Sequence, residues 1–214
     1  MNAEPTDGYH RLAARWRRRA VAAAAPARLP SVLYVSYDGI LEPLGESQIV
    51  AYLERLGTRY AITLISFEKG QDARHTRRVA RMRTRLEESG IRWMPLWYHK
   101  WPPIVSTAFD VLLGAWRGLA LSLGSDLRLV HSRGYVPALI GLLLRRTRGV
   151  AFLFDMRGFW ADEKVDGGQW RRDSLIYRLV KRFERRFFES ADGIISLTWA
   201  GVAAFPTLGY RIRT

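Results

Sequence analysis

Cysteine is absent from this chain of 214 residues, and lysine and histidine are scarce. The absence of cysteine excludes disulfides, thiolate metal sites and cysteine nucleophiles, and it is compatible with a reducing compartment. The four histidines lie at scattered spacings, so the sequence predicts no metal site. Only four of the 34 basic residues are lysine, which leaves arginine as the dominant cation.

A stretch typical of a transmembrane helix is also lacking. The best candidate covers residues 104–123, but it contains Asp110 and Arg117, and both are costly at the centre of a bilayer. We therefore expect a buried or half-buried amphipathic helix in this segment.

The N-terminus resembles a signal sequence only weakly. An arginine cluster is followed by Ala20 to Ala25, but this apolar part is short and runs into Pro26. We therefore interpret residues 1–30 as a basic extension that is poorly ordered or partly helical. The remaining length fits one large domain, over residues 31–214.

Three motifs of common enzymes are missing from the sequence. It contains no G-x-G-x-x-G dinucleotide fingerprint and no G-x-x-x-x-G-K-[ST] phosphate loop. A G-x-S-x-G elbow is also absent, so nothing supports a hydrolase triad.

Positive charge, in contrast, is abundant, with a formal net charge of +14. Such an excess predicts attraction to anions: phosphorylated ligands, anionic lipid headgroups or nucleic acid. No nucleic-acid-binding motif accompanies the charge, which makes nucleic acid the least favoured of these partners. The 48% of hydrophobic residues is enough for a sizeable core.

Short apolar runs alternate with helical patterns along the chain. Strands are predicted over residues 32–35, 61–67, 91–97, 127–131, 150–154 and 193–197. Helices are predicted over residues 49–56, 77–89, 104–123, 135–146 and 174–189, with another beginning near Ala200. This alternation predicts an α/β fold with a doubly wound, mainly parallel sheet and helices on both faces, that is, a Rossmann-like fold.

The segment 151–163 carries the strongest sign of a binding site. Its buried strand ends in Asp155 and Arg157, and the aromatic Trp160 and the acidic Glu163 follow. Because ligands of open parallel sheets bind outside the carboxyl ends of the strands, these residues are candidates for a site. An ordinary loop with a local pair between Asp155 and Arg157 is the alternative.

Other predicted strand ends add polar residues to the same edge. Asp38 follows the first strand, and His131 and Arg133 end the fourth. His131 is either a group for hydrogen bonding and proton transfer or a satisfied structural histidine. In the loop after the first strand, Gly45 and Ser47 suggest a capped helix N-terminus open to an anion, with a plain loop glycine as the alternative.

The helix predicted over residues 174–189 has two different faces. One face is an apolar stripe, and the other is basic and consists of Arg178, Lys181, Arg182, Arg185 and Arg186. The basic face is either the solvated back of a core helix or a surface that rests on an anionic membrane.

Four segments, in order along the chain, resemble the N-terminal domain of family-4 glycosyltransferases. The first is Asp38-Gly39-Ile40 followed by Leu44-Gly45-Glu46-Ser47-Gln48. The second is Val130-His131-Ser132-Arg133, and the third is Asp155-Met156-Arg157-Gly158-Phe159-Trp160 with Asp162-Glu163. The fourth is Ala191-Asp192-Gly193-Ile194-Ile195-Ser196, so that the resemblance spans roughly residues 31–210.

The resemblance implies a GT-B architecture of two Rossmann-like domains and retaining transfer of a sugar from a nucleotide-sugar, without an essential metal. By analogy, the catalytic candidates are Arg157, Asp155 and His131. Many relatives carry a histidine where this chain has Arg157. The substrate-binding candidates are Gly45, Glu46, Ser47, Gln48, Asp38, Arg133, Trp160 and Glu163.

The length of the chain departs from the family pattern, because only 19 residues follow Ile195. We therefore expect an acceptor-binding half without the donor-binding domain, with little or no activity alone and no cofactor bound by this chain. The nucleotide-sugar would be a co-substrate of the full enzyme. Expected partners are a glycan or lipid-linked acceptor, a separate C-terminal half and an anionic membrane surface. The expected location is the cytoplasm or the inner face of the membrane. The alternative is a non-catalytic basic module that binds anionic membrane or nucleic acid.

Overall fold

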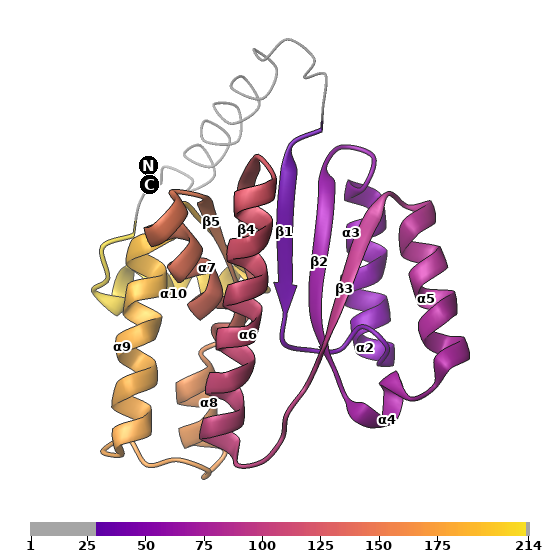
Figure 1. Ribbon diagram of the computed structural model, residues 1–214. Helices are drawn as coiled ribbons and strands as arrows, with labels where there is room; N and C mark the ends of the chain where they lie inside the picture. Colours follow the sequence, from indigo (N-terminus) through magenta and orange to yellow (C-terminus); the bar gives the residue numbers. More distant parts are fainter. Residues whose placement is uncertain (1–28, 213–214) are drawn as a thin grey trace, which may run out of the picture.

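The computed structural model describes residues 29–212, and within them six parallel strands form one sheet (Figure 1). The strand order is β3-β2-β1-β4-β5-β6. The strands are β1 (Ser31–Ser36), β2 (Ala61–Glu68), β3 (Ile91–Trp97), β4 (Leu127–Arg133), β5 (Ala151–Met156) and β6 (Gly193–Ser196). The order reverses between β1 and β4, and this is the point at which doubly wound sheets bind ligands. The predicted N-terminal extension lies almost entirely outside the described residues.

Helices cover both faces of the sheet, which confirms the predicted fold class. One face carries α2 (Pro43–Gly45), the π-helical turn η1 (Glu46–Val50), α3 (Ala51–Leu56) and α5 (Thr76–Glu88). The other carries α6 (Pro103–Gly124), α7 (Tyr135–Arg148) and α9 (Leu175–Ser190). The remaining short helices are α4 (Gly70–Ala73), α8 (Trp160–Asp166), α10 (Trp199–Ala204) and the 3-10 turn η2 (Phe205–Leu208).

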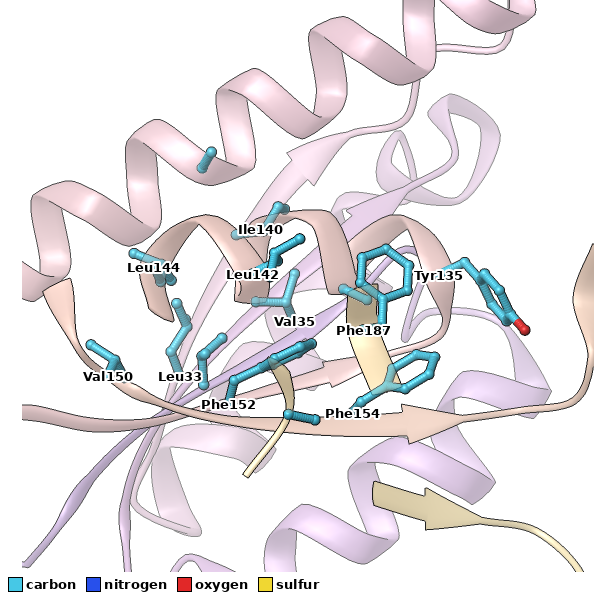
Figure 2. Close-up of a cluster of buried hydrophobic side chains, with 14 of the residues drawn as sticks. Leu33, Val35, Tyr135, Ile140, Leu142, Leu144, Val150, Phe152, Phe154 and Phe187 are labelled. Carbon is cyan, nitrogen blue, oxygen red and sulfur yellow. The ribbon is translucent and has the colours of Figure 1, made fainter. Parts of the chain in front are cut away.

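The apolar runs of the strands are explained by burial on both sides. In β1, Leu33 and Val35 pack on one face and Val32 and Tyr34 on the other, so successive residues enter different cores. Figure 2 shows the first core, where side chains of α7 lie over β1 and β5, with Phe187 from α9 beside them.

Local signals set several helix ends. Ser174 caps α9 by accepting a hydrogen bond from the backbone N–H of Tyr177, and Thr198 caps α10 through the N–H of Gly201. Gly149 ends α7 in the left-handed conformation, with φ of 67°.

Two segments differ from the sequence-based prediction. Helix begins at Pro43 rather than Ile49, because proline fits the first helical turn, where its missing N–H costs nothing. The predicted loop after β5 contains α8, whose first turn holds Asp162 and Glu163, and acidic residues stabilise a helix N-terminus.

Candidate functional site

Polar side chains from β4 and β5 meet at the carboxyl edge of the sheet. His131 and Arg133 belong to β4, and Arg133 is paired in register with Asp155 of β5. All three residues are buried, with 4%, 5% and 6% of their surface exposed, respectively. Arg157 follows β5 directly, so the register alone brings the three predicted catalytic residues to one place.

His131 faces Asp155, with 3.5 Å between His131 Nε2 and Asp155 Oδ2. The aromatic ring of Tyr34 lies 4.4 Å from the imidazole ring, centroid to centroid, and that of Tyr52 lies 6.1 Å away. His131 Nε2 and Asp155 Oδ1 are buried without a hydrogen-bond partner. His131 is therefore not a satisfied structural histidine at that nitrogen. Because an unpaired buried polar atom is costly, its presence in a folded protein often reflects a functional role.

The two tyrosines keep the wall beside His131 neutral. Burial, reinforced by the Asp155 carboxylate, raises the pKa of Tyr34 well above its ordinary value of 10. The same two causes raise the pKa of Tyr52. Sequence reasoning missed both residues, because Tyr34 reads as strand core and Tyr52 as helix surface.

Two arginines converge on one neutral oxygen in this cluster. Arg133 Nη2 donates a hydrogen bond to Gln48 Oε1 at 2.8 Å, and Arg157 Nη2 donates to the same oxygen at 2.9 Å. The nearest carboxylates are farther away: Asp155 Oδ1 lies 3.8 Å from Arg157 Nη1, and Asp38 Oδ2 lies 3.6 Å from Arg133 Nε. A ligand oxygen carrying negative charge would accept two stronger bonds in the place of Gln48 Oε1.

The glycine before this cluster is explained by packing. A Cβ on the buried Gly45 would lie 2.1 Å from the carbonyl oxygen of Gly39, so only glycine lets α2 lie against the loop backbone. Helical geometry from Pro43 onward then brings Gln48 to the arginines. The predicted cap at Ser47 is wrong, because Ser47 lies inside the helical stretch and donates to the carbonyl of Leu44.

Glu46 is not brought to the cluster. Its carboxylate forms an ion pair with Arg85 of α5, on the face of the sheet that α3 and α5 cover. Arg85 also holds Glu54, so this network joins η1 and α3 to α5. Glu46 therefore helps to position the helical turn that carries Gln48.

A groove opens beside Arg157, with a volume of about 600 Å³. Its walls come from the end of β5, from α8 with Glu163, and from residues 196–201 at and after the end of β6. The Glu163 carboxylate lies against Gly158, where a Cβ would come within 2.0 Å of Glu163 Oε1. Trp160 does not line the groove: its ring packs against those of Tyr135 and Trp170.

Lys181 does not face outward, contrary to the predicted membrane-facing set. It forms ion pairs with Asp162, at 2.8 Å, and with the fully buried Glu184. Partial burial opposes its charge, but the bonds to both carboxylates outweigh it and hold the pKa of Lys181 above its usual range. Glu184 also accepts hydrogen bonds from Tyr135 and Tyr210, and no sequence pattern predicts this network.

The other predicted basic residues of α9 remain at or near the surface. Arg178, Arg182 and Arg185 are exposed and Arg186 is half-buried. Arg185 pairs with Glu189 on the same helix. No group of three or more metal-binding side chains occurs among residues 29–212.

Comparisons with known proteins assign no family to the chain. No family model and no curated protein sequence matches the chain. Among solved structures, the chain is similar to that of Anabaena Alr3699/HepE in complex with UDP and glucose, with 13% sequence identity and a TM-score of 0.48. The match covers 84% of this chain and 41% of that protein, so the chain spans about two fifths of its length. The Rossmann-like assignment stands on the strand order and helix layers of this chain itself.

Proposed function

We propose that this domain is the acceptor-side half of a retaining glycosyltransferase that uses a nucleotide-sugar donor. The observation that carries the proposal is the pair of hydrogen bonds to Gln48. They join three of the four segments that resemble family-4 enzymes, although Gln48 lies 85 residues from Arg133 and 109 from Arg157. The three residues belong to different motifs but converge at the switch point of the sheet. A ligand that all three bind is the best explanation for this convergence.

The chemistry of sugar transfer fits the charges of the cluster. The bond between the anomeric carbon of the sugar and the donor phosphate breaks, and the nucleoside diphosphate keeps its electron pair. A bond from the anomeric carbon to the acceptor oxygen forms, and the acceptor hydroxyl loses its proton. Arg157 and Arg133 would offset the negative charge on the leaving phosphate, which preorganised cations do well in a water-poor site. Asp155 and His131 lie together and would orient the acceptor hydroxyl and receive its proton.

A second Rossmann-like domain would supply the rest of the donor site, either on the same polypeptide or on a separate one. The groove beside Arg157 would hold part of the acceptor, a glycan or the sugar end of a lipid-linked glycan. No bound cofactor is needed from this half, since the nucleotide-sugar is consumed as a co-substrate.

Turnover of nucleotide-sugars by the chain together with its donor-binding half tests the proposal. Arg157→Ala should lower kcat by about 100-fold or more, because it removes a cation from the developing charge. Arg128→Ala, an exposed arginine near the start of β4, is the matched control and should leave the rate unchanged. Equal rates in the Arg157 variant and the wild type would overturn the site, and absence of any transfer would favour a non-catalytic binding module.

A further inference from the structure

The long helix α6 turns its apolar side to solvent. Its large outward side chains are 52% to 74% exposed, and they form a stripe along the whole helix: Ile104, Val105, Phe109, Leu112, Trp116 and Leu123. A surface helix of a globular domain normally buries such residues and exposes charged ones. Contiguous apolar patches of this kind mark interaction surfaces.

The inward side of α6 is small or polar. Its buried residues are Ser106, Asp110, Gly114, Ala115, Gly118 and Ser122. A Cβ on Gly114 would lie 2.6 Å from Ile140, and one on Gly118 would lie 3.1 Å from Leu144, so both glycines let the helix pack closely on α7. The helix is therefore seated on the domain mainly by its small residues, with Val111, Leu113, Leu119 and Leu121 partly buried against the core, and the outward stripe of six large residues is left for another partner.

Cations accompany the apolar stripe, and α6 itself exposes no acid. Arg117 lies over the ring of Trp116, 4.7 Å from its centroid, and Lys100 and the 81%-exposed Trp101 precede the helix. Asp110, the one acid of α6, is fully buried and accepts hydrogen bonds from Tyr37 and from the backbone N–H of His99.

Helix α9 extends this surface. It lies on the same face of the sheet as α6, and α7 packs against both (Figure 1). Its exposed residues include Leu175 and Leu179, next to Arg178 and Arg182. The combination repeats that of α6: apolar side chains among arginines.

We infer that the α6 face, with the exposed part of α9, rests on the surface of a bilayer that contains anionic lipid. Among the described residues, α6 is the one helix long and apolar enough to cross a membrane, but its packing on α7 seats it flat on the domain. It is roughly 33 Å long, since each of its 22 residues adds about 1.5 Å. Apolar side chains enter the headgroup boundary, tryptophans favour that depth, and arginines attract anionic lipids.

A second copy of the chain is the competing occupant, and charge argues against it. In a two-fold dimer the same patch lies on both sides of the interface. Arg117 of one copy would then meet a surface with the same positive charge and no exposed acid on α6 to offset it. The net charge of +14 adds repulsion between copies but attraction to an anionic bilayer.

Membrane docking of this face would place the candidate site near the bilayer. This step rests on the function proposed above. Tyr37 at the end of β1 and His99 after β3 both bond to Asp110, so the first turns of α6 lie at the carboxyl edge of the sheet. A lipid-linked acceptor would reach this edge with its lipid still in the bilayer.

Co-sedimentation of the full chain with vesicles tests the inference. The wild type should bind vesicles of phosphatidylcholine with phosphatidylglycerol, bind phosphatidylcholine alone more weakly, and lose part of its binding in high salt. The double variant Leu112→Glu/Trp116→Glu should partition at least about tenfold more weakly, because two charged side chains replace apolar ones that would enter the headgroup boundary. Leu44→Glu, an exposed leucine on the opposite face of the sheet, should bind as the wild type does.

Far-UV circular dichroism and melting temperature should be equal in all variants, because the substituted side chains are exposed. Absence of binding by the wild type, or unchanged binding by the double variant, would overturn the inference. A wild-type dimer that Leu112→Glu dissociates in sedimentation velocity would instead assign the face to a second copy. Vesicle binding without any sugar transfer would remove the proposed function and leave the docking surface in place.

Discussion

Gln48 links the two arginines of the candidate site. A neutral amide oxygen accepts hydrogen bonds from two guanidinium groups that come from different strands. The arrangement holds both arginines in place while leaving their charge available to a ligand. Such a site trades stability for function, as binding sites often do.

Gln48→Glu should therefore raise stability and lower transfer activity. A carboxylate would accept two charge-assisted bonds, so the free energy of unfolding should rise by about 1–2 kcal/mol. The same carboxylate would occupy the place of a ligand oxygen, so transfer by the two halves together should fall by about tenfold or more.

Chemical denaturation and the transfer assay measure the two effects. Gln169→Glu is the matched control, because Gln169 accepts one bond from Lys164 at the exposed surface and should change stability by less than about 0.5 kcal/mol. A Gln48→Glu variant that is less stable than the wild type would contradict the arrangement of the two arginines.

At the scale of elements, close packing by glycine decides where helices sit. Gly45 lets α2 lie against the backbone of the loop after β1, and Gly114 and Gly118 let α6 approach α7. A side chain at these positions would push an element away from its neighbour, because protein interiors have no spare volume.

Gly114→Val should lower the free energy of unfolding by about 1–3 kcal/mol, because the side chain would collide with Ile140 and Phe67. Gly124→Val at the end of the same helix faces open space and should cost less than about 1 kcal/mol. Urea denaturation of both variants measures the difference, and equal losses would contradict the close packing of α6.

Gly45→Ala should alter the candidate site indirectly, through a shift of the backbone. Its Cβ would meet backbone rather than a flexible side chain, so α2 must shift and carry Gln48 with it. We expect a loss of about 1–3 kcal/mol in stability together with reduced transfer. Gly70→Ala, whose Cβ would make only an ordinary contact with Trp97, is the control. Unaltered stability in the Gly45 variant would refute the packing explanation.

At the scale of the whole molecule, a buried ion-pair network holds α8, α9 and the C-terminal segment together. Asp162 of α8 and Glu184 of α9 share Lys181, and Tyr210 bonds to Glu184. Breaking one member of such a network leaves a buried charge without its partner, which is costly.

The pH dependence of stability should report on this network. Partial burial favours the protonated form of Asp162, but the bonds from Lys181 and Tyr177 outweigh it and hold its pKa below 3.8. The folded state thus releases this proton more readily, so the stabilisation is present above about pH 3.8 and is lost as the pH falls through the lower folded pKa.

Melting temperatures of the wild type and Asp162→Asn across acid and neutral pH check this. The wild type should melt higher at neutral pH, and the gap should close below about pH 3.8. Asp126→Asn, at an exposed pair with Arg128, should show almost no gap at any pH. A gap for Asp162→Asn that is independent of pH would exclude ionisation of Asp162 as the cause.

The sequence by itself determined the layers of the fold and the edge at which the candidate site residues lie. Alternating apolar runs and helical patterns are local properties, and they sufficed for the six strands and for placing Asp155, Arg157, His131 and Arg133 at strand ends. Helix starts were less predictable, because Pro43 and the acidic turn of α8 act within short segments that carry little periodicity.

Only the tertiary structure decided which of these residues share a partner and which face each helix presents. The hydrogen bonds that Gln48 accepts from two arginines join residues distant in sequence, and they depend on strand register and on the packing of Gly45 against Gly39. The outward apolar side of α6 was equally hidden, because periodicity reveals that a helix has two faces but not which one meets the sheet. The side of α6 with Gly114 and Gly118 meets the domain, because only small residues allow so close an approach to α7. The stripe of large apolar residues therefore faces solvent.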